Sequence, residues 1–449
     1  MSWQQTAPGR FERQFDTIER FYRGIGAAAV HLHKEHYFIS SVVRLKHLPS
    51  IADLQSSWKA LRHLHPQIAT EEDVTGSKLT YTVPTPTDVE QWVKDTFVVH
   101  RQDGQCSADS LDTVLPPSPQ LMLHVLPSTN ELLFRTPHWR IDGIGLIHLQ
   151  NALFTLLANG YPSDLLFDGS ETSRLPPTLD EAACIPLEIT PAMSQAADSE
   201  LSIVFKGSNP VSFTEALPNI TPASSRRIGI HLPRDITQQI ITAGKARGIT
   251  VTAAVQAALV IATRNHISPE NGRLLCFNAL NLRDRLPTPW NGSSGAVAIY
   301  HTGKPCSIDF VENKDFTSVS GLLTAHYRRD IQPLFGVMAD YVPKIGAMLA
   351  MPLDIILQAP GAAHPEFGSL GLVDNHLKTT YARNGSGVDI SIEDWWLGVQ
   401  IINKVLHMYV WTRDGRMYLG CHYNEAFYEN EFVERFLEDW REVLVREMV

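Results

Sequence analysis

The sequence predicts an α/β protein built from two lobes, on the basis of three observations. The chain has 449 residues, which is longer than one compact core usually extends. Hydrophobic residues make up 44% of it and charged residues 19%, as in an ordinary globular protein. Helix-like and strand-like patterns alternate in both halves, which favours the α/β class. We expect an N-terminal lobe at 1–195, a crossover linker at 196–225 and a C-terminal lobe at 226–449.

The N-terminal half contains strands and helices in turn. An apolar stretch at 37–43 is typical of a strand, and residues 54–65 have helical spacing that stops at a proline. Residues 121–126 and 131–136 predict a hairpin around a Pro-Ser-Thr-Asn turn. The second strand of this hairpin leads into a helix-like run at 146–157.

The C-terminal half repeats the alternation. Pro, Ser, Thr and Asn dominate the segment before it, which has no long periodic run and indicates a crossover between lobes. Thr250 or Thr252 would cap the start of a helix. The predicted strands are 227–232, 274–282, 389–392, 404–411 and 416–421, and the predicted helices are 250–263 and 429–447.

Composition excludes several classes of function. The net charge is -10 and no run of Lys and Arg stands out, so nucleic acid is not an expected partner. The first residues lack a signal-peptide core, and the longest apolar helix-like run is too short to span a bilayer, so we expect a cytoplasmic protein with no membrane span. Five scattered cysteines without C-x-x-C spacing predict free thiols and no zinc site; they are Cys106, Cys184, Cys276, Cys306 and Cys421.

The most informative motif is H-x-x-x-D-G, formed by His138, Asp142 and Gly143. It lies where a predicted strand turns into a helix, a place from which an imidazole can project with little freedom to move. Imidazole titrates near neutral pH, so it can take up a proton and return it within one reaction cycle. Glycine allows the chain to bend into the helix. Because such a short pattern also arises by chance, its companions decide its meaning.

Four further stretches accompany this motif, and in this order the set resembles the CoA-dependent acyltransferase superfamily. That superfamily contains plant BAHD acyltransferases, condensation domains of peptide synthetases and fungal trichothecene O-acetyltransferases. The resemblance covers nearly the whole chain, from about residue 10 to 445. The stretches are Arg62-His63-Leu64-His65-Pro66, Asn281-Leu282-Arg283-Asp284-Arg285, Asp394-Trp395-Trp396-Leu397-Gly398 and Leu419-Gly420-Cys421-His422-Tyr423-Asn424.

The chain also departs from the patterns of two branches. Pro137 stands where condensation domains usually carry a second histidine. The plant sequence D-F-G-W-G is only half kept, because Trp396 and Leu397 replace its central glycine and second aromatic residue. Asn281 replaces the acid of D-x-R-x-R. These departures point to the fungal O-acyltransferase branch.

The resemblance implies two chloramphenicol-acetyltransferase-like lobes, each a mixed sheet flanked by helices, with an active-site tunnel between them. It implies an O-acyltransferase that moves an acyl group, acetyl in the first instance, from CoA to a hydroxyl of a hydrophobic secondary metabolite. Acyl-CoA would be a co-substrate, with no bound cofactor and no metal. The partners would be small molecules, with an acyl carrier protein as a variant donor, and a monomer would suffice.

The resemblance also assigns roles to residues. His138 would be the general base, and Asp142 and Gly143 would support the site, with Asp142 paired to Arg283 or, as second choice, to Arg285. Ser369 is a candidate oxyanion donor, although a serine beside glycine is more often a turn residue.

Other interpretations stay open for Trp396 and for the activity itself. Trp396 would line the tunnel or, more commonly for such an aromatic residue, fill core. A biosynthetic cyclase or isomerase could use the same scaffold with His138 as acid and base, as could a carrier-dependent condensation-like enzyme. A non-catalytic binding protein would have no need for His138. His31, His33 and His36 suggest a metal, but no carboxylate or cysteine set completes a site.

Overall fold

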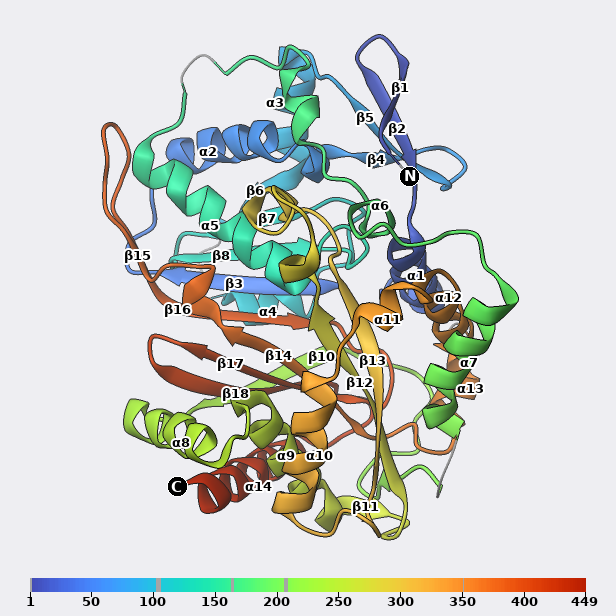
Figure 1. The fold of residues 1–449 in the computed structure, drawn as a ribbon. Coiled ribbons are helices and arrows are strands. Elements are labelled where there is room, and N and C mark those ends of the chain that lie inside the picture. Colours follow the sequence, from blue (N-terminus) through green and yellow to red (C-terminus); the bar gives the residue numbers. More distant parts are fainter. Residues whose placement is uncertain (1, 102–105, 163–164, 206–208, 350) are drawn as a thin grey trace. The chain divides into compact units, whose positions relative to one another are not determined.

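The structure is a computed structural model that describes residues 2–101, 106–162, 165–205, 209–349 and 351–449. Its contacts divide the chain into two compact units that are interleaved in sequence (Figure 1). The first unit comprises Met1–Leu187, Asn281–His301 and Asn375–Val399. The second unit comprises Glu188–Leu280, Thr302–Asp374 and Gln400–Val449.

This division differs from the contiguous lobes and linker that we expected. Two segments from the C-terminal half belong to the first unit, and one of them, Asn281–His301, carries Arg283. The expected crossover linker also contains regular structure, namely α7 (Pro191–Phe205) and β9 (Ser212–Phe213). Helix α7 contacts α12 (Met338–Leu349), where Lys344 forms an ion pair with Asp198 at 2.6 Å. Such long-range contacts stabilise a helix whose own sequence has weak periodicity.

A six-stranded mixed sheet forms the centre of the first unit. Neighbouring strands are antiparallel except for the last pair, which is parallel. The predicted hairpin is confirmed, and β3 begins two residues later than predicted because Tyr37 has a left-handed φ of 62°. In sheet order the strands are β15 (Thr380–Tyr381), β16 (Ile390–Val399), β3 (Ile39–Leu45), β8 (Glu131–Thr136), β7 (Met122–Leu126) and β6 (Phe97–Val99).

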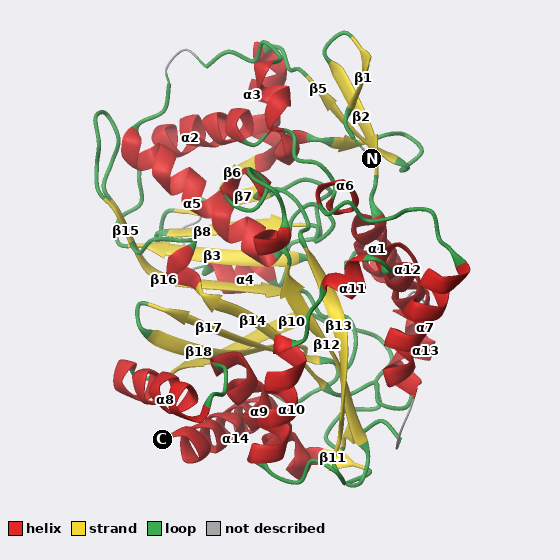
Figure 2. Ribbon diagram, in the orientation of Figure 1, coloured by secondary structure: helices red, strands yellow, loops and turns green. Residues whose placement is uncertain are grey.

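Helices α2 (Ile51–Leu64), α3 (Pro86–Thr96) and α5 (Gly143–Asn159) lie together on one face of this sheet (Figures 1 and 2). Trp58 of α2 and Trp92 of α3 are buried, with stacked rings 5.5 Å apart. The unit also has a small antiparallel sheet of β1 (Gln4–Ala7), β2 (Arg10–Gln14), β5 (Lys78–Thr82) and β4 (Glu71–Glu72). Its other helical segments are α1 (Thr17–Gly26), η1 (Ala27–Leu32), η2 (Pro66–Ala69), α4 (Ala108–Asp112), η3 (Ser170–Arg174), α6 (Leu179–Ala182), η5 (Arg283–Arg285) and η6 (Ser293–Gly295).

The second unit repeats this strand arrangement in its four-stranded sheet. A first strand pairs antiparallel with the second strand of a hairpin, and the first strand of that hairpin pairs parallel with the strand before it. The same relation joins β3, β8, β7 and β6 in the first unit. In sheet order the strands are β10 (Ser225–His231), β18 (Arg416–Asn424), β17 (Leu406–Arg413) and β14 (Pro365–Leu372).

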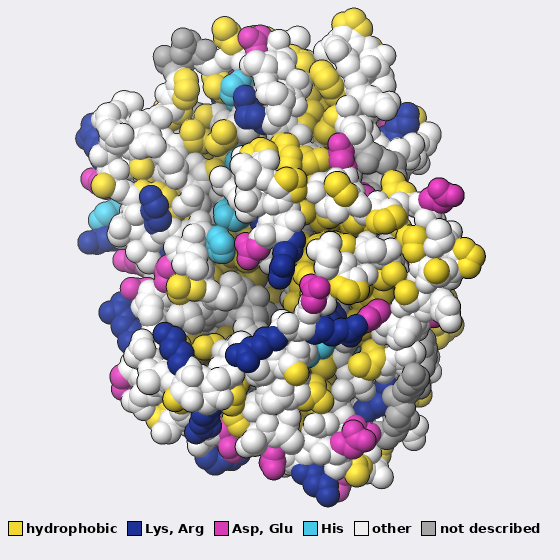
Figure 3. Space-filling view, viewed as in Figure 1, with side chains coloured by type: hydrophobic (Ala, Val, Ile, Leu, Met, Phe, Trp, Pro, Cys, Tyr) yellow, Lys and Arg dark blue, Asp and Glu magenta, His cyan; other side chains and the backbone are white. Residues whose placement is uncertain are grey.

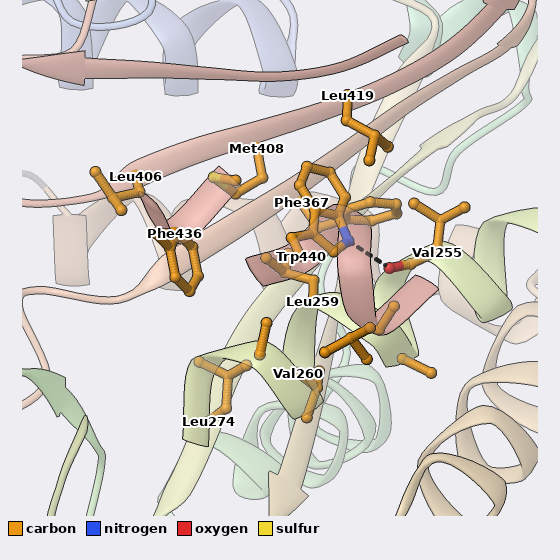
Figure 4. Packing of buried hydrophobic residues seen from close by; sticks show 14 of the residues in the cluster. Val255, Leu259, Val260, Leu274, Phe367, Leu406, Met408, Leu419, Phe436 and Trp440 are labelled. Atoms are coloured by element: carbon orange, nitrogen blue, oxygen red, sulfur yellow. Dashed lines mark hydrogen bonds between the residues drawn. The ribbon is translucent and has the colours of Figure 1, made fainter. Parts of the chain in front are cut away.

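The core of the second unit packs one face of this sheet against α8 (Arg234–Arg247), α9 (Val251–Thr263) and α14 (Asn430–Met448) (Figures 1 and 4). Thr250 caps α9 as predicted, accepting the Ala253 N–H at 3.1 Å. The remaining elements are β11 (Ile267–Ser268), η4 (Arg264–His266), β12 (Arg273–Asn281), β13 (His301–Asp309), α10 (Phe316–Arg328), α11 (Gln332–Phe335), α13 (Leu353–Gln358) and, across the boundary, η7 (Val373–Asn375).

The two units therefore confirm the expected class, a mixed sheet flanked by helices in each half. On the face seen in Figure 3, basic, acidic and apolar side chains are interspersed. Among the described residues, no single helix is long and apolar enough to cross a membrane; one bent pair, Arg234–Arg247 with Val251–His266 at 102°, passes that test by combined length and composition.

Candidate active site

His138 lies in the turn between β8 and α5, where the sequence places it. Its side chain is half-buried, whereas the three residues that follow, Trp139, Arg140 and Ile141, are buried. Arg140 donates to the Thr70 carbonyl at 2.9 Å, and this hydrogen bond ties the turn that carries His138 to Thr70. The turn is therefore rigid, and it presents one imidazole that stays accessible.

Two aromatic side chains flank His138. The ring of Tyr22, from α1, stacks on the imidazole with centroids 3.8 Å apart and an interplanar angle of 1°. The imidazole of His301, at the start of β13, lies 5.4 Å from the centroid of His138 and equally far from that of Tyr22. Three rings from three separate segments of the chain thus meet within the first unit.

The side chain of Asp142 forms an ion pair with Arg283. Arg283 Nη1 donates to both carboxylate oxygens, at 2.9 and 2.8 Å, so the expected ion pair is present. The other expected partner, Arg285, is exposed. Burial by itself would raise the pKa of Asp142, but Arg283 and then His301 outweigh it and lower that pKa below its ordinary value.

The same carboxylate also fastens backbone segments together. Asp142 caps α5 by accepting the Gly145 N–H at 2.7 Å, and it accepts the Tyr300 N–H at 2.7 Å. In return, its own N–H donates to the Ala298 carbonyl at 3.2 Å. Asp142 therefore fixes the residue that directly precedes His301, and so helps to place the second imidazole.

Gly145 is required where α5 meets this segment. A Cβ at that position would lie 2.1 Å from the Ala296 carbonyl oxygen and 2.9 Å from Arg283 Nη2. Only glycine allows backbone to approach backbone this closely. The glycine that the close contact demands is thus two residues beyond Gly143 of the motif.

A buried polar network attaches α5 to the sheet. Gln150 donates to the Ser41 hydroxyl at 2.9 Å and accepts from Trp395 Nε1 at 2.9 Å. Ser41 in turn donates to the Trp396 carbonyl at 2.7 Å. Trp395 therefore faces α5, and strand alternation puts Trp396, which is also buried, on the opposite face of the sheet. This burial agrees with the core interpretation, and the tunnel role of Trp396 stays a prediction.

Ser369 belongs to the second unit, in contrast to His138. It lies within β14, beside an irregularity between Ser369 and Gly371, and not in a turn. Its hydroxyl is half-buried and 3.3 Å from the hydroxyl of Thr252, in the first turn of α9. Its proposed role as oxyanion donor stays a prediction.

Other histidines of the first unit differ from His138. Burial, then Arg174, lowers the pKa of His65 to about 4, and burial, then His376, lowers the pKa of His148 to about 4. Both side chains are therefore neutral at pH 7. His31 and His33 are exposed, and within the described ranges no cluster of three or more His, Cys, Asp or Glu is placed to hold a metal ion.

Sequence reasoning missed Tyr22, His301 and Gly145. Tyr22 is a buried aromatic residue on an amphipathic helix, which by itself indicates core packing. His301 is 163 positions from His138, and no spacing rule connects them. Only Gly145 had a local signal, because it follows Gly143 in a segment that is otherwise strongly apolar.

The chain is similar to known transferase sequences. A family model described as "Phthiocerol/phthiodiolone dimycocerosyl transferase C-terminus" matches residues 221–299. Acetyltransferase pigO of Monascus ruber is 29% identical over 468 residues, covering 100% of this chain and 98% of the relative. O-acetyltransferase pigM of the same organism is 26% identical over 468 residues, covering 100% of this chain and 87% of the relative.

Solved structures agree with the fold. The trichothecene 15-O-acetyltransferase TRI3 from Fusarium sporotrichioides has a TM-score of 0.82 at 16% identity, covering 100% of this chain and 97% of that chain. The epimerization domain from the third module of tyrocidine synthetase B has a TM-score of 0.63 at 13% identity, covering 98% of this chain and 97% of that chain.

The α/β fold of this chain, with a mixed sheet in each of its two units, is shared with these solved structures. Together, the sequence relatives and the fold are consistent with a CoA-dependent acyltransferase and condensation-like superfamily. The protein is an acyltransferase.

Proposed function

We propose that the protein transfers an acetyl group from acetyl-CoA to a hydroxyl of a hydrophobic secondary metabolite, with His138 as general base. The observation that carries the proposal is the separation of roles in the motif: His138 stays accessible, while Asp142 is fully engaged in holding the loop. The names of two full-length relatives, an acetyltransferase and an O-acetyltransferase, support acetyl as the group and oxygen as the acceptor.

In the proposed reaction, His138 takes a proton from the acceptor hydroxyl and later gives it to the leaving group. His138 removes the hydroxyl proton as the acceptor oxygen attacks the thioester carbonyl, and a C–O bond forms. The tetrahedral oxyanion then collapses, the C–S bond breaks, and the imidazolium protonates the leaving thiolate. The products are an ester and free CoA, and His138 is neutral again. No metal or resident cofactor takes part in this scheme.

Asp142 supports this chemistry without taking part in it. Each of its carboxylate oxygens accepts a hydrogen bond from Arg283 and another from a backbone N–H. This arrangement differs from a Ser-His-Asp triad, in which the aspartate hydrogen-bonds the catalytic imidazole. We propose that Asp142, Gly143 and Arg283 hold the loop, and that His138 carries out the proton transfer.

Charge on the oxyanion calls for a preorganised donor. We propose Ser369 for this role because its hydroxyl lies 3.3 Å from that of Thr252, in the first turn of α9, and the N-terminal end of a helix favours negative charge. Trp396 is proposed as an apolar wall of the substrate tunnel. The substitutions Ser369→Ala and Trp396→Leu test these two roles through kcat and through the KM of the acceptor.

Incubation with acetyl-CoA labelled in the acetyl group tests the proposed function. The protein is mixed with a panel of hydrophobic primary and secondary alcohols, and products are identified by mass spectrometry. We expect labelled ester and slow release of CoA without acceptor, both lost in His138→Ala and kept in His47→Ala, whose histidine is exposed. Absence of CoA release and of any His138-dependent product would overturn the proposal and favour a different reaction on the same scaffold, such as isomerisation or cyclisation.

A further inference from the structure

We infer that Tyr22 and His301 are positioning residues for His138: the Tyr22 ring fixes the plane of the imidazole, and the second imidazole limits its protonation. Neither residue belongs to the H-x-x-x-D-G motif, and they reach it from α1 and from the start of β13. The inference rests on the proposed function of His138 as general base.

The stacking of Tyr22 on His138 fixes the plane of the imidazole. The two rings are parallel within 1°, and their centroids are 3.8 Å apart, so they are in face-to-face van der Waals contact. Tyr22 itself is buried. A rotation of the imidazole about its Cβ–Cγ bond would drive an edge into the phenol ring, so the ring plane of His138 is set by Tyr22.

Helix α1 is held firmly enough to act as a support. Asp16 and Glu19 form a capping box at its start, and Glu19 is paired to the buried Arg13 at 2.6 Å. The Thr17 N–H and hydroxyl both donate to Asp180, at 3.0 and 2.8 Å. These buried contacts fix the first turn of the helix, and Tyr22 lies only one and a half turns further on.

Tyr37 also contacts the Tyr22 ring. Its centroid lies 6.5 Å from that of Tyr22 at 65°, an edge contact, and its own ring stacks on His36 at 3.9 Å. Tyr37 adopts a φ of 62°, a conformation that is costly for a bulky side chain. Strain of this kind persists only where the surroundings demand it, and here it directs an aromatic ring toward the reaction centre.

His301 brings a second titratable group to a fixed distance from His138. Its neighbour Tyr300 is held at three points: its N–H donates to Asp142, its carbonyl accepts from Leu282, and its hydroxyl donates to the Pro177 carbonyl at 2.8 Å. The two imidazole centroids are 5.4 Å apart. Two positive charges at this separation repel each other, so a proton on one imidazole disfavours a proton on the other.

The expected consequence is that a proton on His301 favours the neutral form of His138. The titratable and charged groups of this region include Tyr22 from α1, His301 from β13, and the Asp142–Arg283 pair, whose opposite charges offset each other. Among these groups, His301 carries an imidazole, the side chain whose ordinary pKa lies near neutral pH. While it is protonated, His138 is kept in the form that accepts a proton.

Tyr22 is tested by comparing Tyr22→Leu with Tyr22→Phe. We expect Tyr22→Leu to lower kcat for CoA release by about 10- to 100-fold with little change in the KM of acetyl-CoA, because a base that rotates is misplaced. Tyr22→Phe keeps the ring and should restore kcat to within about threefold of the wild type. Equal kcat for the wild type and a folded Tyr22→Leu would overturn the role of Tyr22.

Two variants test the role of His301: one has no charge at this position, and the other has a permanent positive charge. His301→Asn removes the variable charge, and we expect the midpoint of the acid limb of kcat/KM to move to higher pH. His301→Lys places a permanent positive charge there, and the midpoint should move to lower pH. Midpoints that coincide in all three proteins would overturn the role of His301.

Imidazole titration by NMR separates this inference from the proposed function. In protein labelled at histidine, the His138 signals are assigned by their loss in His138→Ala, and their midpoint is followed in the wild type, His301→Asn and His301→Lys. If no thioester is cleaved but the midpoints shift as above, the proposed function fails and the coupling of the two imidazoles stands. If thioester is cleaved and the midpoints coincide, the coupling fails and the proposed function stands.

Discussion

Arg283 holds both carboxylate oxygens of Asp142 with a single nitrogen, Nη1, at 2.9 and 2.8 Å. Both side chains are almost completely buried, with 2% and 4% of their surface exposed. The pair joins the turn that carries His138 to the segment Asn281–His301 that carries the second imidazole. This ion pair connects the two stretches of chain that form the site, and its two residues are 141 positions apart in the sequence.

Loss of this pair should cost stability. We expect Arg283→Met to lower the free energy of unfolding by about 3–5 kcal/mol, because it leaves a buried carboxylate without its counter-charge. Urea denaturation followed by tryptophan fluorescence measures the change. The matched control is Arg285→Met, two residues away and exposed, which should stay within about 0.5 kcal/mol of the wild type. Equal losses in the two variants would refute the structural role of Arg283.

The stability of the protein should depend on pH through the ionisation of Asp142. Its pKa in the folded state is lowered from the ordinary 3.8, so its contribution is complete above that value and is lost as pH falls through the folded-state pKa. We expect the stability difference between the wild type and Asp142→Asn to be constant from pH 7 to about 5 and to shrink below about 3.8. A difference that does not change with pH would show that Asp142 is not ionised in the folded protein.

Glu35 should behave in the opposite way. Burial, then Glu72, raises its pKa from 4.5 to about 7, so its favourable protonated state is lost as pH rises through about 7. We expect Glu35→Gln to stabilise the protein at pH 8, by at most about 3 kcal/mol, and to change little at pH 4. Thermal melts at the two pH values measure this. Glu393→Gln, at an exposed position, is the control, and an equal effect of both variants would contradict the assignment.

Gly145 should not tolerate even alanine. The added methyl group would meet the Ala296 carbonyl oxygen at 2.1 Å, so α5 or the segment 295–298 must shift. We expect a loss of about 1–3 kcal/mol, as for other overpacked sites, together with a fall in acyl transfer. Gly24→Ala in α1, where the added group meets nothing within 4 Å, should be neutral or stabilising by up to about 1 kcal/mol. If Gly145→Ala were as harmless as Gly24→Ala, the close backbone contact would not exist.

Much of the fold follows from local sequence signals. The hairpin of β7 and β8, the helix capped by Thr250, and the last helix all form where apolar spacing, turn residues and caps predict them. Helix α7 was missed, because contacts with α12 support it and its own pattern does not. The interleaving of the two units was also missed. Residues Asn281–His301 join the first unit through the charges of Arg283 and Asp142, which no local pattern encodes.

The candidate site also contains some residues that the sequence predicts and others that it does not. His138, Asp142 and Arg283 could be predicted because they lie in motifs that keep their order along the chain. Tyr22 and His301 could not, because a buried tyrosine on a helix and a histidine beside a strand have ordinary structural explanations. Their meaning depends on a ring distance of 3.8 Å in one case and 5.4 Å in the other, and such distances exist only in three dimensions.

The rate of labelled acetyl transfer by His138→Ala tests whether His138 removes the proton of the acceptor. With the fold verified by circular dichroism and His47→Ala as control, we predict that kcat falls by about 10²- to 10⁴-fold while acetyl-CoA still binds, as expected for loss of a general base. A folded His138→Ala that transfers acetyl groups at the rate of the wild type would contradict the account.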